Sequence, residues 1–179
     1  RRRYPGGIAG GGSDPAVRPA HERILEAMTK QVPLRVAIAG YGVVGKRRRE
    51  HIDSFANLQT VAVCDRTVDG DGVFDDGVRY FHSYKDLLQT DIDVLFVCLT
   101  NDVAAEVTIA GLERGLHVFC EKPPGRTVSD IRRVIACEKN HPGQKLKYGF
   151  NHRYHDSVVG QLELINRALR AFADHGFAH

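Results

Sequence analysis

A glycine pattern restricts the fold of this chain more than any other feature of its sequence. The apolar run from Leu34 to Ala39 stops at Gly40, and the glycines Gly40, Gly42 and Gly45 then follow in the order G-x-G-x-x-G. Gly40 allows a tight turn, Gly42 lets a ligand approach the backbone, and Gly45 lets the next helix pack close to the strand. A buried strand, such a turn and a helix N-terminus together form a diphosphate-binding site, because the helix N-terminus offers unpaired N–H groups.

The rest of the chain alternates between short apolar runs, typical of parallel strands buried on both faces, and helical segments. The expected strands are Leu34–Ala39, Leu58–Cys64, Val78–Phe81, Asp93–Leu99, Leu116–Cys120 and Lys145–Phe150. The expected helices are Val43–Phe55, Tyr84–Gln89, Val103–Arg114, a segment capped by Thr127 that runs to Lys139, and Gln161–Phe172, with a loop at residues 68–77 and a cap at Thr100–Asp102. This order predicts an α/β fold with a doubly wound, parallel, Rossmann-like sheet.

The two ends of the chain differ from this central part. Residues 1–33 are rich in arginine, glycine and proline, which predicts a flexible arm. The only methionine, Met28, stands just before the first expected strand, and we hypothesise that it is the natural start and that the residues before it are non-native. A genuine disordered arm is the alternative. Residues 34–150 are expected to form a dinucleotide-binding domain, and residues 151–179 the entry to a second domain.

Composition argues against several classes of function. Of the 179 residues, 42% are apolar and 26% are charged, and the net charge of +3 is too small to indicate binding to nucleic acid or a membrane. No apolar run approaches the roughly 20 residues of a membrane span. The cysteines Cys64, Cys98, Cys120 and Cys137 form no CxxC pair. This pattern is typical of reduced thiols and predicts a cytoplasmic protein.

Asp65 follows the second expected strand, about 20 residues beyond the glycine turn. A carboxylate at this position can accept both hydroxyls of an adenosine ribose and would repel a 2′-phosphate. Arg66, next in the chain, could pair with such a phosphate. The two residues therefore favour NAD and leave NADP open. A carboxylate that merely caps its strand is the alternative.

Lys122 is the residue that we expect to take part in chemistry. It follows the fifth expected strand, so it emerges at the carboxyl edge of the sheet, where ligands of such sheets bind. A lysine beside a cofactor ring and a carboxylate, here Glu121, can act as an acid or base on a hydroxyl. Lysines in loops are more often simply solvated, and that alternative stays open.

Two other clusters have simpler interpretations. The basic run Lys46–Arg49 on the first expected helix is interpreted as a solvated helix face that also helps to balance diphosphate charge. His152, His155 and Asp156 invite a metal interpretation. They lack an HExxH pattern and a cysteine pair, so no metal site is predicted.

Several segments together resemble the Gfo/Idh/MocA oxidoreductases, NAD(P)-dependent enzymes that act mainly on sugars, inositols and nucleotide sugars. The resemblance runs from about Leu34 to Val159. It is most specific at residues 115–124, Gly-Leu-His-Val-Phe-Cys-Glu-Lys-Pro-Pro, which are similar to the family's G-x-H-V-x-x-E-K-P signature. The glycine turn, Cys64–Arg66, Leu99–Asp102 and Gly149–Tyr154 carry the rest of it.

The resemblance implies a role for each matching residue. Lys122 would contact the reacting hydroxyl of a small polyol or sugar-type substrate, and its bond to Pro123 is a candidate for the cis form. The residues implied to contact NAD, or NADP, are Gly40, Tyr41, Gly42, Val43, Val44, Gly45, Asp65, Arg66, Thr100, Asn101, Glu121 and Lys122. Asn151 and Arg153 would lie on the substrate side, near the junction with the second domain.

The sequence also departs from the family in two ways. Asn101 follows Thr100 where the family usually has a proline, and Ala104–Ala105 stand where a histidine is expected. The family's substrate-binding second domain has no room in a chain that ends at His179. We therefore expect the nucleotide-binding part of a truncated oxidoreductase, able to bind cofactor, with poor turnover or none and weakened oligomerisation. A non-catalytic dinucleotide-binding module and the inactive product of an interrupted gene are the alternatives.

Overall fold

A computed structural model of the chain describes residues 32–175, except for the side chains of residues 152, 153, 158, 168, 169 and 171–175. Residues 1–31 and 176–179 lie outside this description. The hypothesis about Met28 and the flexible arm concerns those residues almost entirely, so it stays a prediction.

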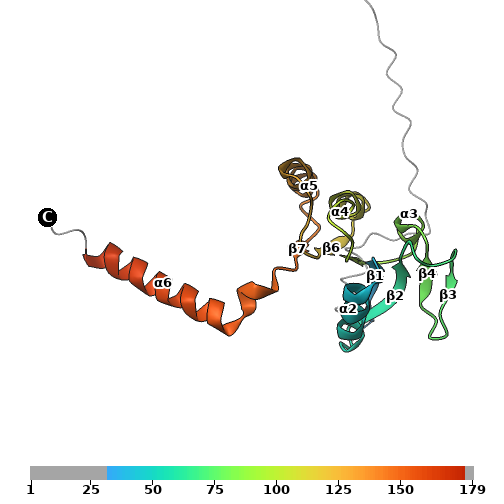
Figure 1. Cartoon of the computed structure of the whole chain (residues 1–179), viewed down its shortest axis with the longest axis horizontal. Coiled ribbons are helices and arrows are strands. Elements are labelled where there is room, and N and C mark those ends of the chain that lie inside the picture. Colours follow the sequence, from blue (N-terminus) through green and yellow to red (C-terminus); the bar gives the residue numbers. More distant parts are fainter. Residues whose placement is uncertain (1–31, 176–179) are drawn as a thin grey trace, which may run out of the picture.

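Seven strands form one sheet (Figure 1). They are β1 (Leu34–Ala39), β2 (Leu58–Cys64), β3 (Gly72–Val73), β4 (Arg79–Phe81), β5 (Val94–Val97), β6 (His117–Cys120) and β7 (Leu146–Tyr148). Their order is β3-β4-β2-β1-β5-β6-β7, and every neighbouring pair is parallel except β3 with β4. The chain leaves β1 first toward β2 on one side and later reaches β5 on the other. The predicted doubly wound, Rossmann-like sheet is confirmed.

The expected loop at residues 68–77 is wrong in part, because it contains the edge strand β3. Gly72 pairs with Tyr80 and Val73 with Arg79, antiparallel to β4. A Cβ at Gly72 would lie 2.4 Å from the Tyr80 hydroxyl oxygen, so any larger residue there would displace the Tyr80 ring. Two residues are too few to show an apolar alternation, which explains why the sequence pattern did not reveal the strand.

Helices cover both faces of the sheet (Figure 1). They are α2 (Val43–Asp53), α3 (Tyr84–Leu87), α4 (Ala104–Glu113), α5 (Val128–Asn140) and α6 (Asp156–His175), with a 3-10 turn, η1 (Asn151–Tyr154). Helix α2 lies on one side of the sheet, and α3, α4 and α5 lie on the other. Successive side chains of β1 alternate between these sides: Ile38 packs with Ile52 of α2, and Ala37 joins the cluster that contains Leu112 of α4.

Side-chain caps fix two of these helix starts. Thr127 accepts a hydrogen bond from the Asp130 N–H, and the Asp130 carboxylate accepts one from the Thr127 N–H at 2.9 Å, so the predicted cap of α5 is confirmed as a full capping box. Ser83 accepts from the Lys85 N–H at 3.1 Å and caps α3. The predicted cap of α4 at residues 100–102 is wrong, because the N-cap residue is Val103 and it makes no side-chain cap bond.

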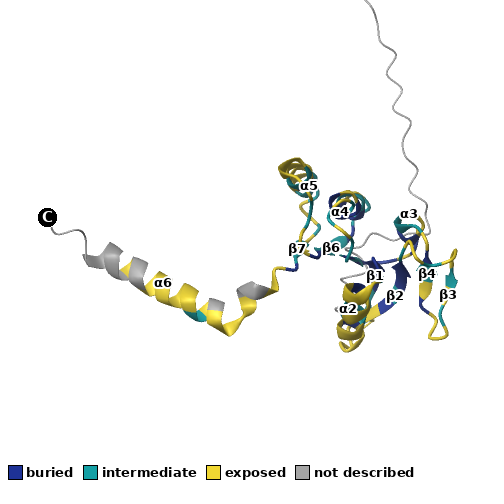
Figure 2. Cartoon of the chain, in the orientation of Figure 1, coloured by how far each residue is buried: buried dark blue, intermediate teal, exposed yellow. Residues whose placement is uncertain are grey.

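Helix α6 is longer than predicted and extends away from the sheet (Figures 1 and 2). Its described apolar side chains include Leu162 and Ile165, which are 49% and 54% exposed. None of the described helices has the length and apolarity that crossing a membrane requires.

Candidate nucleotide-binding site

The carboxyl edge of the sheet aligns the residues that follow the strands. Each of these residues donates its backbone N–H to the last carbonyl of a neighbouring strand, at 2.7–3.0 Å. The donor and acceptor pairs are Asp65 to Phe81, Gly40 to Cys64, Cys98 to Ala39, Glu121 to Val97, and Gly149 to Cys120. This ladder brings segments far apart in sequence to one edge, as expected for a ligand site of a doubly wound sheet.

Each glycine of the turn is needed for a different reason. Gly40 has a φ of 93°, and a Cβ there would lie 2.4 Å from the carbonyl oxygen of Cys98. A Cβ on Gly45 would lie 2.0 Å from the carbonyl oxygen of Gly40, so Gly45 brings α2 against the end of β1. A Cβ on Gly42, the N-cap of α2, would meet nothing within 4 Å and would enter open space. That space lies where a diphosphate would approach the helix N-terminus, so the turn fits such a group.

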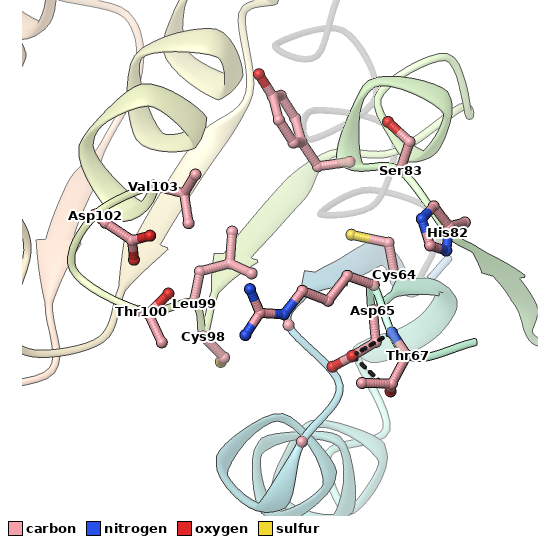
Figure 3. Close-up of a pocket in the computed structure, with 14 residues that line it drawn as sticks. Cys64, Asp65, Thr67, His82, Ser83, Cys98, Leu99, Thr100, Asp102 and Val103 are labelled. Carbon is pink, nitrogen blue, oxygen red and sulfur yellow. Dashed lines mark hydrogen bonds between the residues drawn. The ribbon is translucent and has the colours of Figure 1, made fainter. Parts of the chain in front are cut away.

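A cleft of about 630 Å³ opens beside this turn (Figure 3). Gly40, Gly42, Asp65, Arg66 and Thr100, all predicted site residues, line it. They come from the ends of β1, β2 and β5, so the structure brings together residues that the sequence separates widely. The size and position of the cleft suit a nucleotide.

Asp65 is held in a fixed orientation at the cleft. Its Oδ2 accepts from the Tyr41 N–H at 2.9 Å, and its Oδ1 accepts from the N–H and hydroxyl of Thr67 at 3.0 and 2.8 Å. Although burial by itself raises its pKa, the bonds from Thr67 and Tyr41 and the charge of Arg66 hold the pKa of Asp65 below its ordinary value. Three of the carboxylate's roughly four acceptor positions are used, so one on Oδ2 remains for a ligand hydroxyl.

Sequence reasoning missed the wall of the cleft that follows β4. His82, Ser83 and Tyr84 line it, as does Thr67 after Asp65. The His82 Nδ1 lies 3.0 Å from the Val68 carbonyl oxygen, and because a carbonyl only accepts, Nδ1 is the protonated nitrogen. The sequence could have indicated these residues. In such sheets the ligand binds beside the residues that follow the strands, and this applies to the end of the Val78–Phe81 segment as it does to Asp65.

Three residues of the cleft lining have a raised pKa. Tyr84 donates its hydroxyl to Glu106, and this bond, with burial, raises the pKa of Tyr84 to about 12. Burial raises the pKa of Cys64 to about 11 and that of Cys98 to about 12. These thiols stay protonated at neutral pH, and all four cysteines are free.

The remaining predicted cofactor residues of the turn and the next loop contribute in different ways. Tyr41 offers its N–H to Asp65, but its ring packs on Phe74 with centroids 5.9 Å apart. Val43 and Val44 lie in the first turn of α2, 69% and 47% exposed. Asn101 is half-buried and does not belong to the cleft lining.

Glu121 and Lys122 lie along the same edge but outside the cleft lining. Lys122 is exposed, and its bond to Pro123 is cis, as the resemblance implied. Glu121 is only 8% exposed and pairs with Arg48 of α2. The two residues of the signature therefore have opposite environments.

The interpretation of Lys46–Arg49 as a solvated helix face is wrong for two of its residues. Arg48 is paired with Glu121, and Arg49 donates to the Tyr41 hydroxyl at 2.8 Å and also contacts Asp76. Lys46 and Arg47 are exposed, as expected. A helix placed against the sheet by Gly45 turns one side inward, so the consecutive residues Arg48 and Arg49 meet partners in loops that follow or connect the strands.

On the predicted substrate side, Asn151 begins η1 and is exposed, and the side chain of Arg153 lies outside the described residues. Of the suggested metal cluster, His155 and Asp156 are exposed, and His155 Nδ1 lies 2.9 Å from the Ser157 hydroxyl. The described residues contain no group of three or more histidine, cysteine, aspartate or glutamate side chains placed to hold a metal.

Comparison with known proteins identifies the family. Residues 34–150 match Gfo/Idh/MocA, described as "Oxidoreductase family, NAD-binding Rossmann fold". The chain belongs to this family. Those residues are its NAD-binding Rossmann fold, and the resemblance seen in the sequence is confirmed.

The curated relatives of this Gfo/Idh/MocA chain include dehydrogenases. Inositol 2-dehydrogenase of Salmonella typhimurium (strain LT2) is 30% identical over 142 residues, which cover 74% of this chain and 41% of the relative. D-glucoside 3-dehydrogenase of Escherichia coli (strain K12) is 35% identical over 133 residues, covering 72% of this chain and 37% of the relative. The chain thus spans about two fifths of the length of these relatives.

Solved structures agree with the fold. A myo-inositol 2-dehydrogenase from Lactobacillus plantarum has a TM-score of 0.63 at 28% identity, covering 75% of this chain and 41% of that one. A scyllo-inositol dehydrogenase from Lactobacillus casei, with bound NAD(H) and scyllo-inositol, has a TM-score of 0.65 at 23% identity, covering 75% and 41%. At that lower identity the likeness concerns the fold alone.

Proposed function

We propose that this chain supplies the NAD-binding half of a dehydrogenase that moves a hydride to or from the carbon bearing a polyol or sugar-type hydroxyl. The observation that carries the proposal is the fixed carboxylate of Asp65, held by the Tyr41 N–H at 2.9 Å beside the glycine turn. A carboxylate there takes a ribose hydroxyl and repels a 2′-phosphate, which favours NAD over NADP. Bound NAD would supply the hydride acceptor, and NADH the donor.

Different residues of the chain would contact different parts of the dinucleotide. The first turn of α2, starting at Gly42, directs backbone N–H groups and positive helix-dipole charge toward the diphosphate. Asp65 orients the adenosine ribose through the acceptor position that remains on Oδ2. Arg66 and Thr100 line the same cleft and complete its polar wall.

Lys122 is the residue proposed to handle the proton. It is exposed at the carboxyl edge, after β6, on the opposite side of β1 from Asp65. A dinucleotide lying across the end of β1 with its adenosine at Asp65 would extend its nicotinamide toward this side. The Lys122 Nζ would take the proton of the substrate hydroxyl as hydride leaves, and return it in the reverse direction.

The test is a titration of the purified chain with NADH and with NADPH, followed by nicotinamide fluorescence. We expect NADH to bind more tightly than NADPH. Asp65→Ala should weaken NADH binding about tenfold or more, the effect of losing one hydrogen bond to a charged group. Asp75→Ala, an exposed aspartate outside the cleft lining, is the matched control and should bind as wild type does. Equal binding of NADH by wild type and Asp65→Ala would contradict the ribose role.

A second candidate function is that of a dinucleotide-binding module without turnover. The exposure of Lys122, which the cleft does not enclose, favours it. Measurement of NADH formation with myo-inositol and with a glucoside distinguishes the two. Turnover that disappears in Lys122→Ala supports the dehydrogenase, and NADH binding without turnover supports the module.

Substrate class and location belong to the same proposal. The relatives' names indicate inositol and glucoside substrates, so we propose a small polyol or sugar-type molecule here. We also propose that residues 34–150 act as the nucleotide-binding domain and that the protein is cytoplasmic, which suits its four free cysteines.

A further inference from the structure

An ion pair joins the helix of the glycine turn to the segment that carries Lys122. The Arg48 Nε donates to the Glu121 Oε1 at 2.6 Å, and a second guanidinium nitrogen contacts the same oxygen. The two side chains are only 24% and 10% exposed. A charge this far removed from water needs a partner, so Glu121 depends on Arg48.

Three segments meet at the Glu121 carboxylate. A Cβ at Gly149, just after β7, would lie 2.7 Å from the Glu121 Oε2, so the carboxylate occupies the space that a side chain at this position would fill. The same Oε2 accepts weakly from the Lys122 N–H at 3.4 Å. On the other side, the Arg48 guanidinium carbon lies 5.2 Å from the centre of the Phe119 ring. Glu121 is therefore enclosed by α2, by the end of β7 and by its own strand.

The shape of the arginine side chain suits this position. Its planar guanidinium can lie flat on Phe119 while its edge donates to Glu121, which a lysine ammonium cannot do as well. The neighbouring Arg47 is exposed, so the burial of Arg48 does not follow from the basic run as a whole.

We propose that Arg48 is a positioning residue for Lys122, acting through Glu121. The inference rests on the proposed function, because it takes the Lys122 side of β1 as the nicotinamide side. Helix α2 would receive the diphosphate at its first turn and, one turn later, hold the Lys122 loop through Arg48. The diphosphate and nicotinamide parts of the site would then be fixed to one rigid helix.

This arrangement has an asymmetric consequence. Loss of Arg48 leaves the buried Glu121 without its partner and loosens the loop that starts at Lys122. Asp65, which is proposed to bind the ribose, lies on the other side of β1, and its carboxylate is held by Tyr41 and Thr67. A ligand that lacks nicotinamide should therefore be affected little.

Calorimetric titration of the full chain with NADH and with ADP-ribose tests the inference. In Arg48→Met we expect NADH affinity to fall about tenfold and ADP-ribose affinity to fall less than about twofold. Arg47→Met, the matched control, removes the same positive charge and should change the two affinities by the same factor, because both ligands carry the diphosphate. Arg48→Lys keeps the positive charge but lacks the planar guanidinium, so its NADH affinity should lie between those of Arg48→Met and the wild type.

Each outcome decides the inference. An equal loss for both ligands would mean a general structural role, and no loss for either would mean that the pair is irrelevant to binding. Both results overturn the proposal. If Arg48→Met does not fold, the comparison of the two ligands is made with Arg48→Lys, in which the same selective loss, smaller in size, is expected.

Hydrogen exchange without ligand separates this inference from the proposed function. In Arg48→Met, the amides of Lys122 and Gly149 should exchange faster than in Arg47→Met, while the Tyr41 amide should not change. Unchanged exchange at Lys122 and Gly149 overturns the positioning role even if NADH binds. If the wild-type chain binds neither ligand while Lys122 and Gly149 exchange faster in Arg48→Met, the proposed function is overturned. The connection from Arg48 through Glu121 to the Lys122 loop would still hold.

Discussion

Two glycines of one turn have different physical reasons for being glycine. Gly45 has no room for a Cβ, which would lie 2.0 Å from the Gly40 carbonyl oxygen. Gly42 has room, because its Cβ would meet nothing within 4 Å, and its backbone φ of −75° is open to any residue. At the scale of single residues, glycine is therefore required for packing at position 45 and for access of a ligand at position 42.

Alanine substitutions should separate these two effects. Gly45→Ala forces a backbone shift between β1 and α2, and we expect the free energy of unfolding to fall by about 1–3 kcal/mol. Gly42→Ala should change it little but weaken NADH binding, because the new methyl group enters the space proposed for the diphosphate. Urea unfolding and NADH titration of both variants check this. A stable Gly45→Ala chain that binds NADH normally would contradict the packing argument.

At the scale of elements, the cap of α5 closes the loop that contains Lys122. Asp130 accepts from the Arg126 and Thr127 N–H groups at 3.1 and 2.9 Å, and a Cβ on Gly125 would lie 2.9 Å from the Asp130 Cβ. The loop after β6 is thus tied at its far end by the capping box and at its near end by Glu121. Its position depends on both attachments.

Removal of the cap should cost stability by a predictable amount. Thr127→Ala loses the bond to the Asp130 N–H, and we expect the free energy of unfolding to fall by about 1 kcal/mol. Thr127→Ser keeps a hydroxyl at the same position and is the matched control. Urea unfolding of the two variants measures the difference. Equal stability of Ala and Ser at this position would show that the cap contributes nothing.

At the scale of the whole molecule, folding changes the pKa of several aspartates, which the composition alone does not show. The net charge of +3 is modest, yet hydrogen bonds and nearby arginines lower the pKa of Asp76, Asp102 and Asp130. The pKa of Asp65 is also lowered, although burial alone would raise it. These aspartates lie in different segments of the chain, so their effect on stability is shared across the fold.

Stability should therefore fall in acid. A carboxyl whose pKa is lower in the folded than in the unfolded chain stabilises the fold above its unfolded value, about 3.9 for aspartate. That contribution disappears as the pH falls through the lower, folded value. We expect thermal unfolding temperatures to drop below about pH 5, as these carboxyls become protonated. Asp65→Asn should make the drop shallower, and a drop of unchanged depth would contradict the role given to Asp65.

Much of this protein was predictable because its signals are local. A buried strand, a glycine turn and a helix start are adjacent in sequence, so Gly40, Gly42 and Gly45 predict the turn. Ligands of such sheets bind at the carboxyl ends of the strands, and this predicts Asp65 and Lys122 as site residues. The capping box of α5 lies within four consecutive residues and was predictable for the same reason. The Rossmann-like order followed from the alternation of strands and helices.

The sequence by itself determined six of the seven strands, the glycine turn and the edge of the sheet where the residues proposed to bind the ligand gather. Only the tertiary structure decided that β3 pairs with β4 and that Arg48 pairs with Glu121. Arg48 and Glu121 stand 73 positions apart, and their contact exists only because Gly45 brings α2 against the sheet. Local periodicity fixes which face a side chain occupies, but the choice of partner depends on which distant segment folding places opposite it.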